Sequence, residues 1–217
     1  MTKTSKLKLM LVTVGVITGI IGILTGCAEL LNGSLLVEEQ YITALPLNWP
    51  NQEFYTKMQG GPVFSLLTDI PYYVIGLLSI SVSITLIVCS LTVVEISKFG
   101  IAIFSLLSVG IFCFGASKSI PVLEMFPAII IAVLALRLKE KQISSSGKRK
   151  LLTLFNFFYW WNISSWVLFF PVIFVLSFYQ EVSPILFQFM GMSMIIATSG
   201  ALITALIYDK SILIDEA

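Results

Sequence analysis

Histidine is absent from the sequence. It is the commonest general base and the commonest metal-ligating side chain, so its absence excludes Ser-His and Cys-His catalytic pairs and most zinc chemistry. Paired aspartates within the predicted spans are absent too, because Asp69 and Asp209 are expected to flank opposite ends of a helical bundle. These absences disfavour a hydrolytic enzyme, and we predict neither a bound metal nor a cofactor.

Charged residues are also scarce. They make up 12% of the chain, whereas 57% of its 217 residues are hydrophobic. Long apolar runs recur from Leu9 to Ile207, and most charges lie in the gaps between them. The net charge of +1 gives no argument for binding nucleic acid. This composition is typical of a protein whose main partner is the lipid bilayer.

The apolar runs can be counted as membrane spans. A hydrocarbon core about 30 Å thick is crossed by about 20 helical residues, and a helix satisfies its own backbone amides in lipid. We therefore predict an all-α, polytopic transmembrane helical bundle of about six spans. They cover Lys8 to Cys27, Ile70 to Ile96, Phe99 to Gly115, Ile120 to Leu138, Leu152 to Ser177 and Leu186 to Tyr208. The break at residues 115–119 is short, which leaves open whether the third and fourth spans both cross fully.

The basic residues predict the orientation, because cytoplasmic loops retain lysine and arginine. With the N-terminus inside, only Lys57 and Lys118 of the 13 basic residues fall outside. Both termini are therefore predicted to be cytoplasmic, in an N-in/C-in topology. The loop 139–150, which ends in Lys148, Arg149 and Lys150, lies on the same side.

Residues 1–27 allow two interpretations. The tetrapeptide LTGC, which ends at Cys27, resembles the bacterial lipobox, so this segment is similar to a lipoprotein signal that is cut to leave a lipidated cysteine. The alternative is a retained first transmembrane helix. Four glycines share one helical stripe that permits close helix packing: Gly15, Gly19, Gly22 and Gly26. Under either interpretation, the predicted location is a bacterial cytoplasmic membrane.

The rest of the chain divides into two parts. Residues 28–69 form a soluble segment outside the membrane, which we expect to be a cap over the bundle or a mobile loop. It is too short for a stable independent domain. Residues 70–217 form a five-span bundle that includes the basic loop 139–150.

Glu124 is the one carboxylate that enters a predicted span. An ionisable group in lipid is costly, so such a residue normally faces water, a partner or a pathway. It lies about 6 Å from the start of its helix. It could therefore bind a ligand in an acidic outer vestibule with Asp69 and Glu181, or it could be a solvated helix end with Lys118 as its counter-charge.

The fifth predicted span is rich in aromatic residues. Trp160, Trp161 and Asn162 are consecutive within it, and a buried indole N–H requires a hydrogen-bond partner. One hypothesis is a ligand pocket walled by tryptophan and asparagine. The alternative is bulky packing against lipid and neighbouring helices.

A non-enzymatic transport, transport-accessory or structural membrane subunit is the function that we expect. Six spans, inside termini, a small-residue stripe on the first helix, Gly61-Pro62 and Asp69 resemble the substrate-binding subunit of energy-coupling-factor vitamin transporters. Such a role implies a membrane-protein partner or a homo-oligomer. The alternative is a membrane-embedded enzyme that acts on lipid with carboxylates at the outer mouth.

Overall fold

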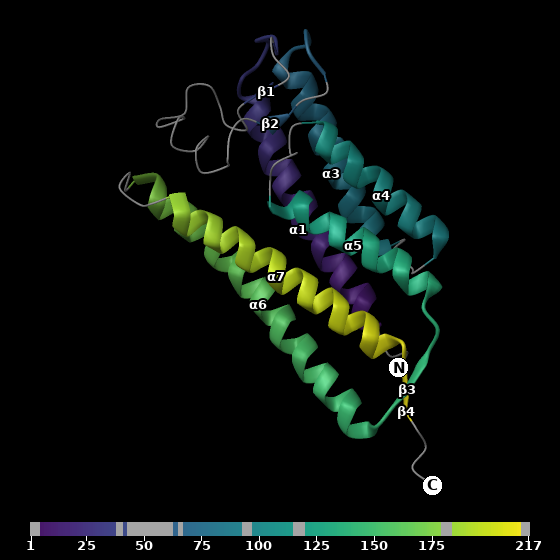
Figure 1. The fold of residues 1–217 in the computed structure, drawn as a ribbon. Coiled ribbons are helices and arrows are strands. Elements are labelled where there is room, and N and C mark those ends of the chain that lie inside the picture. Colours follow the sequence, from purple (N-terminus) through teal and green to yellow (C-terminus); the bar gives the residue numbers. More distant parts are fainter. Residues whose placement is uncertain are drawn as a thin grey trace.

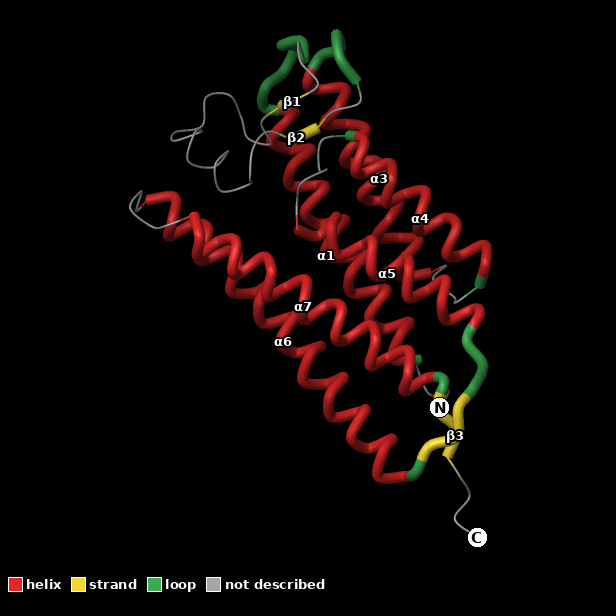
Figure 2. Tube along the Cα trace, in the orientation of Figure 1, coloured by secondary structure: helices red, strands yellow, loops and turns green. Residues whose placement is uncertain are grey.

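The computed structural model describes residues 5–37, 41–42, 63–64, 67–92, 97–114, 120–178 and 184–213. These ranges contain six helices: α1 (Lys6–Leu30), α3 (Tyr72–Thr92), α4 (Lys98–Cys113), α5 (Ile120–Arg137), α6 (Ser145–Phe178) and α7 (Pro184–Asp209). Antiparallel strands β1 (Tyr41–Ile42) and β2 (Val63–Phe64) pair at one end of the bundle. Parallel strands β3 (Lys141–Ile143) and β4 (Ser211–Leu213) pair at the other (Figure 2). The predicted helical class is confirmed apart from these short strands.

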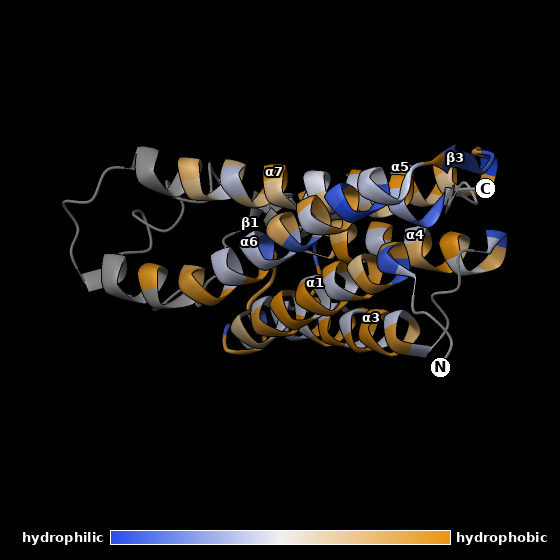
Figure 3. Cartoon of the chain, turned by 90° about the horizontal axis from the view of Figure 1, so that it is seen from below, coloured by the Kyte–Doolittle hydropathy of each residue, from blue (hydrophilic) through white to orange (hydrophobic). Residues whose placement is uncertain are grey.

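Within the described ranges, three helices are long and apolar enough to cross a membrane. They are α1, α3 and the Phe189–Asp209 part of α7, whereas α4 is apolar but shorter. Hydrophobic residues dominate the helices, and hydrophilic ones gather around β3 and the C-terminal end (Figure 3). On α7 the residues that face outward are also apolar, namely Met192, Ile196, Ile203 and Ile207. An exposed apolar stripe of this kind indicates membrane association. Spanning by the other three helices stays a prediction.

The first two described helices, α1 and α3, pack with their backbones in contact. The glycine stripe of α1 is buried against α3 and comprises Gly15, Gly19, Gly22 and Gly26. A Cβ atom on Gly26 would lie only 2.8 Å from the carbonyl oxygen of Gly76. Ser79 donates a hydrogen bond from Oγ to the carbonyl oxygen of Gly22, at 3.1 Å. Because glycine has no side chain, the helices approach closely enough for such direct contacts.

The long helices α6 and α7 lie side by side, and α5 packs against α7 (Figure 1). Helix α1 contacts α3 as well as α5 and α7, and α4 packs against α3 and α5, so the two groups of helices are joined. One apolar core runs through all of these contacts and includes Met10, Leu86, Phe104, Phe155 and Leu202. Three helices, α5, α6 and α7, thereby surround a common interior.

Both ends of the described chain meet at the end of the bundle that carries β3 and β4 (Figure 1). The carboxylate of Asp209, the last residue of α7, accepts hydrogen bonds from the backbone N–H groups of Lys6 and Leu7. The backbone N–H of Lys141 donates to the carbonyl oxygen of Lys210. The Lys148 ammonium donates to the carbonyl oxygen of Ser211 at 2.6 Å. These contacts gather the start of α1, the end of α7 and residues 139–150. Most of the predicted 139–150 loop is structured, because it contains β3 and the first turns of α6.

At the opposite end, the segment between α1 and α3 is closed at its base. Val37 and Asp69 are joined by a backbone hydrogen bond of 2.9 Å, and Val37 also donates to Ile70. Tyr72 and Leu35 form the next link. The predicted cap of residues 28–69 lies mostly outside the described residues. Its two ends are nevertheless tied together, beside the small apolar cluster of Val37, Tyr72 and Ile75.

Candidate functional site

Three polar side chains meet in the apolar interior between α5, α6 and α7. They are Glu124 on α5, Asn162 on α6 and Thr198 on α7, and each has no exposed surface. Polar residues within apolar helices of this kind hydrogen-bond across helix interfaces. We call this set the Glu124 cluster.

Two of the three hydrogen bonds in the Glu124 cluster end on one carboxyl oxygen of Glu124. Thr198 donates from Oγ1 to Glu124 Oε1 at 2.7 Å. The Asn162 amide donates to Thr198 Oγ1 at 2.5 Å and to Glu124 Oε1 at 3.3 Å. Glu124 Oε2 and Asn162 Oδ1 are buried and have no hydrogen-bond partner. The cluster is therefore saturated with donors at one carboxyl oxygen and has unused acceptors elsewhere.

The depth of Glu124 corrects one sequence-based alternative. Thr198, its partner, lies nine residues after Phe189 and eleven before Asp209, or about 14 Å and 17 Å along the helix at 1.5 Å per residue. Asn162 is similarly central in α6. The solvated helix end was therefore the wrong expectation for Glu124. The first turns of α5 lie against the middle of α7, so distance from the start of α5 does not measure depth in the bundle.

The neighbouring tryptophans diverge instead of forming one wall. Trp160 is 62% exposed on the outside of α6, whereas Trp161 donates its indole N–H to Ser193 Oγ on α7 at 3.1 Å. A pocket lined by Trp160, Trp161 and Asn162 is not formed, because successive residues on a helix point about 100° apart. It is Trp166, one turn beyond Asn162, whose buried indole lies beside the Glu124 carboxyl, although its N–H makes no hydrogen bond within normal geometric limits.

The other predicted carboxylates lie elsewhere. Asp69 is exposed, and its backbone adopts a positive φ of 59° at the closed base of the segment between α1 and α3. Glu181 and Lys118, as well as the Gly61-Pro62 pair, lie outside the described residues. Glu29, which was not singled out from the sequence, is fully buried near the end of α1, and neither of its carboxyl oxygens has a hydrogen-bond partner. Among the described residues, no acidic vestibule joins Asp69 to Glu124.

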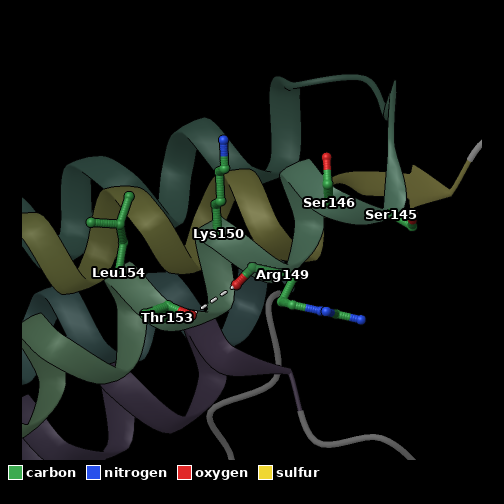
Figure 4. Close-up of a pocket in the computed structure, with 6 residues that line it drawn as sticks. All are labelled: Ser145, Ser146, Arg149, Lys150, Thr153 and Leu154. Carbon is green, nitrogen blue, oxygen red and sulfur yellow. Dashed lines mark hydrogen bonds between the residues drawn. The ribbon is translucent and has the colours of Figure 1, made fainter.

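A recess of about 610 Å³ lies at the start of α6, far along that helix from the Glu124 cluster. It is lined by Ser145, Ser146, Arg149, Lys150, Thr153 and Leu154 (Figure 4). All six come from one helical segment, and the Thr153 hydroxyl is occupied by a hydrogen bond to the carbonyl oxygen of Arg149. The basic side chains point in different directions, so they do not converge on one ligand position (Figure 4).

Cys27, the residue at the end of the lipobox-like tetrapeptide, is exposed and carries a free thiol. It lies within α1, which continues to Leu30. The four glycines that precede it are on the opposite, buried side of the helix. The segment that a signal peptidase would remove is therefore the one that packs most closely on α3.

The Glu124 cluster contains one titratable group, the carboxyl of Glu124, which is fully buried. Burying a carboxylate without a counter-charge is costly, so the site requires a positive charge from outside the three side chains. Among the described residues, no group of three or more Cys, Asp or Glu side chains could bind a metal ion. The predicted site did not include Thr198 or Trp166. Thr198 could have been selected, because it is a polar residue in the middle of a predicted span.

Comparison with known protein families, curated proteins and solved structures finds no match to this chain. The function must therefore be argued from the physical properties of the site.

Proposed function

We propose that this protein is a six-span integral membrane protein of the bacterial cytoplasmic membrane that acts as a small transport or transport-accessory subunit. The Glu124 cluster is the observation that carries this proposal. Hydrophobic side chains of similar volume would join α5, α6 and α7 at less cost than a buried carboxyl group does. Ionisable residues at such depth in membrane proteins are characteristic of ion and substrate pathways.

A proline near Glu124 supports a conformational change in α5 as part of the function. Pro127 lies inside the helix, three residues after Glu124. Proline has no backbone N–H, so the carbonyl oxygen of Leu123 lacks its normal helical donor. Helices in membranes bend preferentially at such positions. A bend beside the cluster would allow its hydrogen bonds to open and close.

The contacts at the β3–β4 end support an N-in/C-in topology with six spans. The start of α1, the end of α7 and the start of α6 are joined there by hydrogen bonds of Asp209 and Lys148. This gathering agrees with the excess of basic residues in the same segments, which indicates the cytoplasmic side. Two ends on one side of a membrane require an even number of spans.

Retention of residues 1–26 is also part of the proposal. The glycine stripe packs on α3 and the first turn of α1 binds the Asp209 carboxylate. Cleavage before Cys27 would remove both sets of contacts. A helix with this much buried surface is better explained as the first span than as a discarded signal.

The alternative, an enzyme that acts on lipid, has less support. It needs carboxylates together at the outer mouth, whereas Asp69 is exposed at the base of a loop and Glu124 is enclosed by three helices. An enzyme would show phospholipid turnover by the purified chain that is lost in Asp69→Asn. A transport-accessory subunit would instead co-purify with a stoichiometric membrane partner or a second copy.

Two experiments test the proposal. Native membranes containing the tagged chain are solubilised in mild detergent, and co-purified proteins are identified by mass spectrometry. A lone monomer with lipid-cleaving activity would contradict it. For topology, single cysteines replace Ser34 and Ser146 in a variant in which Cys27, Cys89 and Cys113 are alanine. An impermeant maleimide is expected to label Ser34→Cys in intact cells, but Ser146→Cys only after permeabilisation, and the reverse pattern would overturn the orientation.

A further inference from the structure

We infer that Glu124 is a proton-binding site, and that its Oε2 atom carries the proton in the conformation described. The bound proton lies between α5, α6 and α7, at the centre of the bundle. This inference rests on the proposed transport function, because it identifies the ion to which movement of a solute would be coupled. It is argued from the hydrogen bonds, the distribution of charge and the space around the carboxyl group.

The two carboxyl oxygens of Glu124 have different surroundings. Oε1 accepts hydrogen bonds from Thr198 and Asn162, at 2.7 and 3.3 Å. Oε2 is equally buried but accepts none. An ionised carboxylate attracts donors at both oxygens, whereas a carboxylic acid accepts at its carbonyl oxygen and donates from its hydroxyl. The asymmetry is that of a carboxylic acid, with Oε1 as the carbonyl oxygen and Oε2 as the hydroxyl.

An unused acceptor is also present in the cluster. Asn162 Oδ1 is fully buried and has no donor. A carboxylate at Glu124 would add further unused lone pairs to this interior and leave a net negative charge there. A proton on Oε2 supplies the missing positive charge and leaves fewer unused lone pairs in this interior. Binding it forms an O–H bond from a lone pair of Oε2, and the hydronium ion that delivered the proton becomes water.

Among the described residues, no basic side chain is close enough to neutralise a carboxylate at Glu124. On the described parts of α5, α6 and α7, the other charged residues lie at the helix ends: Arg137, Lys148, Arg149, Lys150 and Asp209. Arg137 is thirteen residues from Glu124 along the helix, or about 20 Å. The charged residues of α1 are Lys6, Lys8 and Glu29, and that of α4 is Lys98, and all four lie near the ends of these helices. Tyr159, the titratable residue closest to Asn162 in sequence, lies 3.4 Å from the hydroxyl of Thr13 on α1.

The available space and the chemistry of the donors favour a proton over a larger ion. The three side chains have no exposed surface and touch one another at 2.5 to 3.3 Å. A sodium or potassium ion would need several oxygen ligands around it. Glu124 Oε1 already accepts hydrogen bonds from the Asn162 amide and the Thr198 hydroxyl, so a metal ion at this oxygen would have to displace both donors.

Infrared spectroscopy tests the protonation of Glu124 directly. The protein is reconstituted in nanodiscs at neutral pH, and the spectrum of Glu124→Gln is subtracted from that of the wild type. We expect the difference to contain a carboxylic-acid C=O band, above the amide band, that shifts in D₂O. If the difference contains carboxylate stretching bands instead, Glu124 is ionised and the inference is overturned. Raising the pH should convert the first pattern into the second.

Two control variants make the assignment specific. Glu29→Gln removes the second fully buried carboxyl of the described residues, and the band assigned to Glu124 should remain. Thr198→Val keeps Glu124 but removes the hydroxyl that donates to Oε1, so the C=O band should move to higher frequency. An unchanged band in Thr198→Val would show that Oε1 is not the hydrogen-bonded carbonyl oxygen and would contradict the inference. This variant also provides a measurement if Glu124→Gln does not fold.

Sodium as the ligand is examined in the same samples. Replacing choline chloride by sodium chloride at constant pH should leave the acid band unchanged. Loss of the band with a gain of carboxylate bands would identify sodium as the ligand and overturn the proton assignment. The infrared result and the test of the proposed function can fail separately. If Glu124 is protonated but the chain purifies without a membrane partner, the proton-binding inference stands and the transport role is contradicted.

Discussion

The carboxylate of Asp209 at the end of α7 caps the first turn of α1, more than 200 residues away in sequence. Its Oδ2 atom accepts a hydrogen bond of 2.8 Å from the backbone N–H of Leu7 and one of 2.6 Å from the hydroxyl of Ser5. Helix N-terminal amides have no partner within their own helix, and the positive end of the helix dipole attracts an anion. One side chain therefore fixes the first helix to the last.

Asp209→Ala should loosen this connection. Loss of the acceptor at a helix N-terminus costs about 1–2 kcal/mol of unfolding free energy, so we expect a lower midpoint of thermal unfolding in detergent. Asp209→Asn should lower the unfolding midpoint less than Asp209→Ala does, since the asparagine side chain still accepts hydrogen bonds. Asp69→Asn, at an exposed carboxylate, is the matched control and should be neutral. Equal midpoints for the alanine variant and the control would show that the cap contributes nothing.

Gly26→Val should separate α1 from α3. The new side chain would meet the Gly76 carbonyl oxygen within 2.8 Å, and backbone atoms cannot move aside cheaply. Overpacking of this type costs about 1–3 kcal/mol. Leu24→Val changes an exposed position of the same helix and should have little effect on the yield of folded protein. If Gly26→Val unfolds no earlier than Leu24→Val, the close contact between the helices is incorrect.

Thr198→Val should destabilise the protein by removing one member of the Glu124 cluster. The buried amide of Asn162 loses an acceptor and Glu124 loses a donor, which costs about 1–3 kcal/mol. Thr85→Val has the same change in chemistry at an exposed position of α3. Thermal unfolding of the two variants side by side measures the difference. Identical midpoints would mean that the cluster is not closed in the folded state.

Replacing the entire cluster should have a different effect. In Glu124→Met, Asn162→Leu and Thr198→Val combined, no buried polar group loses a partner, so stability should equal or exceed that of the wild type. The apolar triple variant should nevertheless lose the cellular phenotype that the wild type restores to a deletion strain. A triple variant that is less stable than Thr198→Val alone would assign the cluster a structural role instead.

Cys27→Ala tests the lipobox-like tetrapeptide. If α1 is retained as the first span, intact-mass spectrometry should find residues 5–26 in both the wild type and the variant. The two masses should differ only by the substitution. Acylation or a chain that begins at Cys27 in the wild type, abolished by the substitution, would establish the lipoprotein interpretation.

The apolar runs predicted where most helices form to within a few residues, because long hydrophobic segments without charges have few stable alternatives to a helix. The exception is α6, which begins at Ser145 instead of the predicted Leu152, since its first turns are polar and lie outside the apolar run. The apolar runs also predicted the glycine stripe, since its positions follow the helical repeat. The site was predicted less well. Glu124 and Asn162 were selected because a polar residue in an apolar run is conspicuous. Their contact with each other, and the position of Trp166 beside Glu124, could not be predicted from the sequence.

What the sequence by itself determined is therefore local: the helical segments, their apolar faces and the asymmetry of the basic residues. Tertiary structure alone decided that Asp209 reaches the first turn of α1, that Trp160 faces outward, and that Glu124 lies at mid-bundle beside Thr198. The physical reason is that depth and contact depend on how helices are displaced along one another. A periodic pattern specifies which face of a helix is buried, but not the position on the next helix that it meets.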